Sequence, residues 1–86
     1  MPKALSIHRM VAPPAERPRY LERLRAKEAH YHGMGCRFWV FEEQALPGAF
    51  VEFCEADSAA ALSAAHAASP EPVRDPSRIY TQMELR

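Results

Sequence analysis

The stretch CRFWVFEEQALPGAFVEFCE, residues 36–55, decides the fold of this chain. Aromatic and β-branched residues, which favour strands, dominate residues 36–43 and again residues 49–55. Between these runs, Gln-Ala-Leu-Pro-Gly is typical of a turn. We therefore predict a β-hairpin whose turn is centred on Ala45 to Gly48.

The register of this hairpin determines what each of its faces does. If the turn is so centred, Gln44 lies opposite Ala49, and the side chains divide into two sets. One face then carries Cys36, Phe38, Val40, Val51 and Phe53, and the other carries Arg37, Trp39, Phe41, Phe50, Glu52 and Cys54. The first set is suited to pack against helices. The second has three large aromatic rings, and leaving such rings in water forgoes roughly 1.5–3 kcal/mol each, so we expect an interface or a ligand site there. A slip of one residue would mix the two sets.

Outward from the hairpin, each half of the chain predicts a strand and a helix. Residues 3–11 partly alternate, with Ser6, His8 and Met10 on one side, and form a predicted strand. Residues 19–32 contain no Gly or Pro and repeat large apolar residues at helical spacing.

On the C-terminal side of the hairpin, the alanine-rich run 59–68 predicts a second helix, capped by Asp57 or Ser58. Residues 70–77 contain three prolines and form a predicted irregular connector. Residues 78–85 alternate again and predict a last strand.

The resulting order is β-α-β-β-α-β over residues 1–86, a single α+β domain of the ferredoxin-like type. Right-handed crossovers place both helices on one face of a four-stranded antiparallel sheet, with the first and third strands at its centre. A domain of this size buries only about 60% of the surface of its unfolded chain, so we expect it to need a partner. The bare sheet face predicts a homodimer.

Composition excludes several classes of function. The chain has 11 basic and 11 acidic residues, and this balance does not favour nucleic-acid or acidic-membrane binding. No window approaches the roughly 18 apolar residues of a membrane span, and residues 1–17 lack the apolar core of a signal peptide. We therefore expect a cytoplasmic protein with reduced cysteines.

The element order, the Phe-Trp-Val-Phe strand and the Pro-Gly-Ala-Phe-Val-Glu-Phe strand resemble the dimeric α+β barrel superfamily. The resemblance is one of topology and covers nearly the whole chain. It implies two ferredoxin-like sheets packed into a barrel, with a cavity against each sheet. The superfamily includes cofactor-independent monooxygenases resembling those of antibiotic biosynthesis, haem-degrading monooxygenases, isomerases and amino-acid-sensing modules.

If the protein is an enzyme, the candidate catalytic pair is His8 and Glu52, predicted to lie on the bare face. A His beside a carboxylate in a semi-apolar cavity is suited to proton transfer, here with His8 as base and Glu52 orienting it. No cofactor or metal is required for this chemistry. The predicted substrate-binding residues are Arg37, Trp39, Phe50, Tyr80 and Gln82.

Other interpretations stay open beside this one. His8, Glu52 and Arg37 could instead form a polar network across the dimer seam of a non-catalytic or ligand-sensing module. The resemblance also raises haem binding through His66 and Trp39, but the chain has no asparagine to complete that site, and a surface or helix-end His66 is the simpler interpretation.

The remaining candidate groups have structural explanations. His30 and His32 suit the C-terminal end of a helix, where a cation is favourable, better than they suit a metal site. Cys36 and Cys54 fall on opposite faces in the predicted register, so we expect two small buried thiols without a bridge.

Overall fold

The structure is a computed structural model that describes residues 2–86. Its elements confirm the predicted order. They are β1 (Ala4–Val11), the 3-10 turn η1 (Pro14–Glu16), α1 (Arg17–Gly33), β2 (Arg37–Glu42), β3 (Ala49–Ala56), α2 (Ala59–Ala67) and β4 (Tyr80–Thr81).

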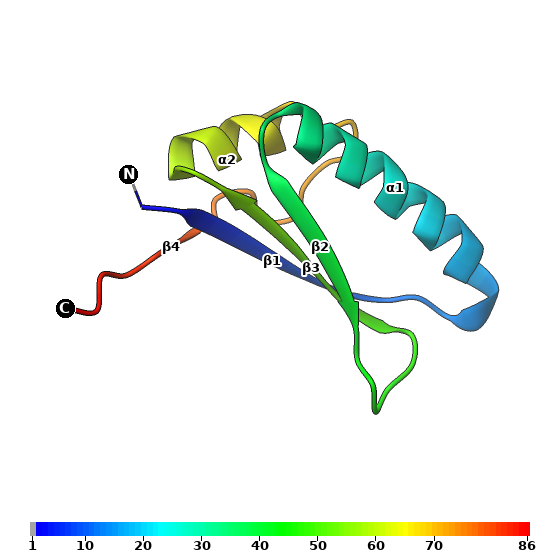
Figure 1. Cartoon of the computed structure of the whole chain (residues 1–86). Coiled ribbons are helices and arrows are strands. Elements are labelled where there is room, and N and C mark those ends of the chain that lie inside the picture. Colours follow the sequence, from blue (N-terminus) through cyan, green and yellow to red (C-terminus); the bar gives the residue numbers. More distant parts are fainter. Residues whose placement is uncertain (1) are drawn as a thin grey trace.

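The four strands form one antiparallel sheet in the order β2-β3-β1-β4. β1 and β3 lie at the centre, as the sequence predicts, and both helices lie on one side of the sheet (Figure 1). The fold is therefore α+β and is compatible with a ferredoxin-like fold. The other side of the sheet has no helix over it among the described residues (Figure 1).

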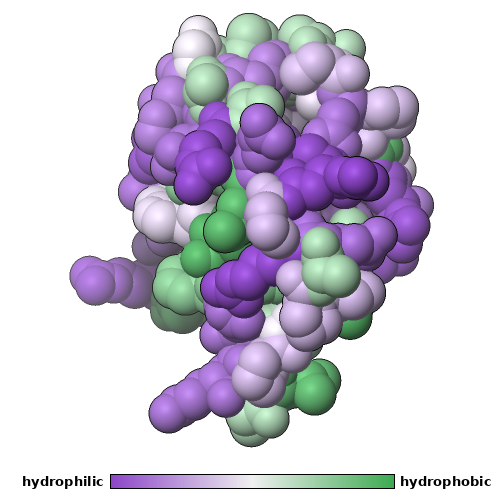
Figure 2. All heavy atoms as spheres, turned by 90° about the vertical axis from the view of Figure 1, so that its right-hand side faces the viewer, coloured by the Kyte–Doolittle hydropathy of each residue, from purple (hydrophilic) through white to green (hydrophobic). Residues whose placement is uncertain are grey.

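Each helix packs on the sheet through a narrow stripe. Tyr20, Leu24 and Tyr31 of α1 are buried at helical spacing. On α2, Leu62 and Ala65 are fully buried, and the small alanine side chains let the helix approach the sheet closely. Seen from the α1 side, the surface is mainly polar and is broken by an apolar strip (Figure 2).

The hairpin register differs by one residue from the prediction. Trp39 lies opposite Phe53, and Glu43 bonds to Ala49, so the loop is residues 44–48 and Gln44 belongs to it. The Glu42 carboxylate fixes this loop, because it accepts a hydrogen bond from the Gly48 N–H at 3.0 Å.

Gly48 itself is required at this turn. Its φ is +95°, and an added Cβ would lie 3.0 Å from the backbone oxygen of Ala12. The backbone N–H of Ala12 donates to the Gly48 carbonyl at 2.8 Å, which ties the hairpin loop to the end of β1. These contacts come from a distant part of the chain, so the turn sequence alone does not specify them.

The shift transfers half of the predicted site to the other side of the sheet. Phe50, Glu52 and Cys54 face the helices, and Val51 and Phe53 join Trp39 and Phe41 on the bare side. Because β1 pairs with β3, the side chains opposite that buried set also face the helices. These are Ser6, His8 and Met10. The prediction that these three, Phe50, Glu52 and Cys54 lie on the bare face was wrong, as was the separation of Cys36 from Cys54, which are both buried and free.

β4 is much shorter than predicted. Only Tyr80 and Thr81 pair with β1, opposite Leu5 and Ala4, at the start of that strand. Residues beyond Gln82 therefore run past the point where β1 begins and have no strand beside them within residues 2–86, despite their alternating sequence. At its other end β4 begins only at Tyr80, opposite Leu5, so β1 beyond Leu5 has a strand partner on one side only.

Candidate functional site

A cavity of about 510 Å³ lies along the open edge of β1. Five consecutive residues of that strand, from Ser6 to Met10, line it together with α1 and the connector 69–78. Successive side chains of a strand point to opposite faces, so an unbroken run can line one cavity only if the cavity reaches the strand edge. The cavity therefore occupies the place where a longer β4 would have paired.

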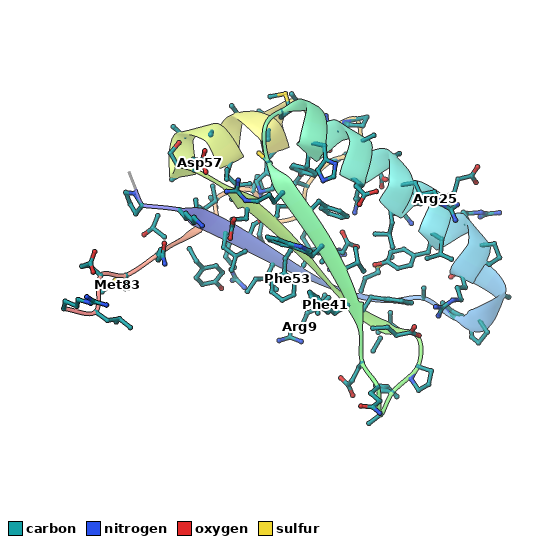
Figure 3. The ribbon with its side chains drawn as sticks, in the orientation of Figure 1. Arg9, Arg25, Phe41, Phe53, Asp57 and Met83 are labelled. Atoms are coloured by element: carbon teal, nitrogen blue, oxygen red, sulfur yellow. The ribbon has the colours of Figure 1, made fainter. Side chains whose placement is uncertain are left out.

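The main chain of β1 offers hydrogen-bonding groups to this cavity. The Lys3 carbonyl accepts from the Gln82 N–H at 2.8 Å, so the polar groups of Lys3 point toward β4. Alternate residues of an antiparallel strand point the same way, which directs the N–H and C=O of Ile7 and Arg9 to the open edge. No backbone hydrogen bond from residues 69–79 reaches them in the described chain. The Arg9 side chain lies on the other side of the sheet, so Arg9 meets the cavity through its main chain (Figure 3).

Glu52 is a buried carboxylate on the cavity wall. Only 3% of it is exposed, and it accepts hydrogen bonds from the Tyr20 hydroxyl at 2.8 Å and from Lys27 Nζ at 3.0 Å. Burial, together with this carboxylate, raises the pKa of Tyr20 above its ordinary value, so the phenol stays protonated and donates. The paired charges of Lys27 and Glu52 place a strong local dipole beside the cavity.

His8 lies directly across the β1–β3 ladder from Glu52, on the same side of the sheet. Its imidazole is half-buried and lines the cavity. Among residues 2–86 it makes no side-chain hydrogen bond or ion pair, and Glu52 is held by Tyr20 and Lys27 instead. The structure thus brings the two predicted catalytic residues together, but leaves the imidazole available to a ligand.

A hydrogen-bonded chain of three side chains forms another part of the cavity wall. The His66 ring lies 2.7 Å from the Tyr31 hydroxyl through Nδ1 and 3.1 Å from Ser6 Oγ through Nε2. His66 is only 6% exposed, so the prediction of a surface position was wrong, although it does lie in the last turn of α2. Burial and the neighbouring His30 lower the pKa of His66.

The predicted substrate-binding residues do not gather in one place. Tyr80 borders the cavity. Arg37 and Trp39 lie on the bare side, where Arg37 is paired with Glu55 and Asp57.

The other two predicted binding residues are also outside the cavity. Phe50 is buried in the core, with its ring centroid 4.7 Å from that of Tyr20. The exposed Gln82 bonds to Lys3 through its backbone. The one-residue register shift explains why Phe50 and Glu52 lie on the helix side of the sheet, whereas Trp39 lies on the bare side as predicted.

Sequence reasoning missed the contribution of α1 to this site. Tyr20, Leu24, Lys27 and Tyr31 follow one helical stripe, so a lysine interrupts an otherwise buried row. A cation at such a position needs a buried anion, and this was the available signal for the pairing with Glu52.

The metal and haem interpretations gain no geometric support. His30 Nε2 is 2.8 Å from the Ala65 carbonyl, and no group of three or more His, Cys, Asp or Glu side chains within residues 2–86 is placed to hold a metal ion. Both ring nitrogens of His66 already have partners, so binding iron would require one of these bonds to break. None of the helices in residues 2–86 has the length and apolar character needed to cross a bilayer.

Searches against protein-family models, curated proteins and solved structures gave no match for this chain.

The lowered pKa of His66 predicts a pH-dependent stability. Below the ordinary value of 6.5, the unfolded chain binds a proton that the buried ring resists, so stability is lost as the pH falls. Between about pH 7 and about pH 5, we expect the free energy of unfolding to fall more steeply in the wild type than in His66→Gln. Urea titrations across this window measure both slopes. The exposed His32→Gln should follow the wild type, and parallel curves for wild type and His66→Gln would contradict the assignment.

Proposed function

We propose that this protein is a homodimeric, ferredoxin-like barrel protein that binds a small organic molecule in the cavity along β1. The observation that carries the proposal is the unpaired His8 imidazole beside Glu52 in a cavity of about 510 Å³. That volume lies within the usual range of small-molecule sites, roughly 300–1,000 Å³.

The bare side of the sheet supports the dimer. Most of its side chains are apolar, and the rings of Phe41 and Phe53 pack edge to face with centroids 5.6 Å apart, on the side away from the helices (Figure 3). Soluble monomers rarely expose a contiguous apolar surface of this kind. Its exposed members are Ile7, Val11, Trp39, Phe41 and Tyr80.

A second copy is the occupant best suited to this face. The rows of β2 and β3 end at the ion-paired Arg37 and Glu55, and Arg9 interrupts the row of β1. An apolar area that is bordered by charged groups and includes an arginine is usual in a protein interface. Two such faces packed across a two-fold axis would bury both apolar centres together.

The chemistry we propose is proton transfer to His8 from an activated phenol or enol. The imidazole takes the hydroxyl proton and becomes imidazolium, and the ligand becomes its oxyanion. The N–H of Ile7 or that of Arg9 at the open edge then donates to the oxyanion. This proton transfer is also the first step of a cofactor-independent oxygenation, the reaction class that the sequence resemblance implies.

The test is a titration of ¹⁵N-labelled protein with p-nitrophenol, followed by amide and His ring resonances. We expect the largest shifts at Ile7, His8 and Arg9, and affinity at least about tenfold weaker in His8→Gln, a loss of about 1.4 kcal/mol. His32→Gln, an exposed histidine away from the cavity, is the matched control. Shifts confined to the bare face around Trp39, or none at all, would refute ligand binding in the cavity.

A further inference from the structure

We infer that Ser6 is a nucleophile that accepts an acyl group from a small carboxylic ester bound in the cavity, with His66 as its base. This inference rests on the proposed function, because it needs the cavity to admit a small organic molecule. It assigns chemistry to Ser6 and His66, two side chains of the wall that proton transfer by His8 does not use.

The geometry is that of an activated hydroxyl. Ser6 Oγ and His66 Nε2 are 3.1 Å apart, within the reach expected for a nucleophile and its base. On the far side of the ring, Nδ1 is 2.7 Å from the Tyr31 oxygen. When Nδ1–H donates to that oxygen, Nε2 carries the lone pair that accepts the Ser6 proton, so Tyr31 is a positioning residue for the base.

The position of His66 keeps the ring in the form that a base requires. The ring is almost fully buried between α2, α1 and β1, and it packs edge-on to Tyr31 with centroids 5.6 Å apart. Burial disfavours the imidazolium, so the ring is neutral near pH 7. The base is therefore both oriented and available.

Cys54, on the same wall, is the competing nucleophile. Burial raises the pKa of its thiol to about 11. At pH 7 only roughly one thiol in ten thousand would then be ionised, and the thiolate is the reactive form. Ser6, with a hydrogen-bonded base, is the better nucleophile at this position.

The open edge of β1 supplies the group that would stabilise the charge formed. The N–H of Ile7 points to the cavity and belongs to the residue that follows the nucleophile. A backbone N–H in that relation to a nucleophilic serine is a common oxyanion donor. β4 begins only at Tyr80, opposite Leu5, so no residue of that strand pairs with Ile7 and its N–H is left without a strand partner.

The reaction balances with the ester and water alone. Ser6 Oγ bonds to the ester carbonyl carbon as its proton passes to His66, and the oxyanion lies at the Ile7 N–H. The carbonyl then reforms, the bond to the alkoxy oxygen breaks, and the leaving alcohol takes the proton from His66. Water, deprotonated by His66, attacks the acyl-serine and releases the carboxylic acid with Ser6 restored.

The experiment uses the whole chain with p-nitrophenyl acetate at pH 7.5. Release of p-nitrophenolate is followed by absorbance, and the acetylated residue is located by mass spectrometry of peptides. We expect a burst that approaches one acetyl group per chain, on Ser6. Ser6→Ala should abolish the burst, and His66→Gln should slow acylation about a hundredfold or more. The exposed Ser63→Ala, on α2, is the matched control and should behave as wild type.

Two further measurements separate the inference from the alternatives. If the Ser6–His66 pair only ties α2 to the sheet, His66→Gln would lower the unfolding temperature without a selective loss of acylation. Binding of p-nitrophenol to Ser6→Ala tests the cavity without the nucleophile. If the wild type binds p-nitrophenol but is not acylated, Ser6 is not a nucleophile, and the proposed function stands. Acetyl groups only on lysine or histidine, or an unchanged burst in Ser6→Ala, would also refute it.

Discussion

Replacing Phe41 with aspartate should convert the proposed dimer into folded monomers. The Phe41 ring is 57% exposed in the single chain, so the fold does not depend on burying it, whereas a sheet-to-sheet dimer would cover it. Loss of one buried ring forgoes roughly 1.5–3 kcal/mol, and a two-fold interface loses two rings at once. The dissociation constant should rise by about two orders of magnitude or more.

Leu46→Asp is the matched control for this experiment. Leu46 is 56% exposed, nearly the same as Phe41, but it lies in the hairpin loop. Sedimentation velocity at micromolar concentration should show a dimer for the wild type and for Leu46→Asp, and a monomer for Phe41→Asp. Far-ultraviolet circular dichroism checks that each chain is folded. A wild-type monomer, or a Phe41→Asp dimer, would remove the barrel from the proposal and leave the cavity within each chain to be tested separately.

The order of elements was predictable because it rests on local patterns. The hairpin residues, the helical stripe through Tyr20 and Leu24, and the alanine-rich helix each contain a local pattern of their own, and the structure places each of these three features within a few residues of its predicted bounds. Ser58 accepts from the Ala61 N–H at 3.1 Å and caps α2, one of the two predicted alternatives.

The register was not predictable in the same way, because distant contacts determine it. Glu42 accepts from both Gly48 and Arg17, and Arg17 belongs to a helix that begins 25 residues before it in the chain. Since side chains in a strand alternate with a period of two, this single-residue difference exchanges the two faces of β3. The predicted face of β1, with Ser6, His8 and Met10 on the bare side, is exchanged as well.

The candidate site consists of polar residues that the sequence pattern predicts to lie on an outer face. Ser6, Glu52 and His66 all face the interior, and each has a hydrogen-bond partner on another element. The partner of each residue lies on another element, so the sequence pattern of one strand or helix does not reveal it. Only the packed structure distinguishes these residues from solvent-exposed ones. The short β4 is a second such feature, because its end depends on where β1 begins.

Replacing Lys27 with methionine should destabilise the protein more than any substitution on its surface. Lys27 is the cationic partner of Glu52, and the two side chains are only 18% and 4% exposed. Removing one member of a buried ion pair leaves the other charge without compensation, at a cost of about 3–5 kcal/mol. Because Lys27 retains some contact with water, we expect about 3 kcal/mol, measured by urea unfolding at pH 7.5.

The loss of stability should come from the unpaired Glu52 carboxylate and not from the loss of a lysine as such. Lys3→Met, at an exposed position, should change the free energy of unfolding by less than about 0.5 kcal/mol. In the combined variant Tyr20→Phe, Lys27→Met, Glu52→Leu, all three polar groups of the cluster are removed together, so no buried group is left without a partner. Its stability should return to within about 1 kcal/mol of the wild type, because apolar replacement of a complete buried ion pair is often neutral. A single variant Lys27→Met as stable as the wild type would show that Glu52 does not depend on this pairing.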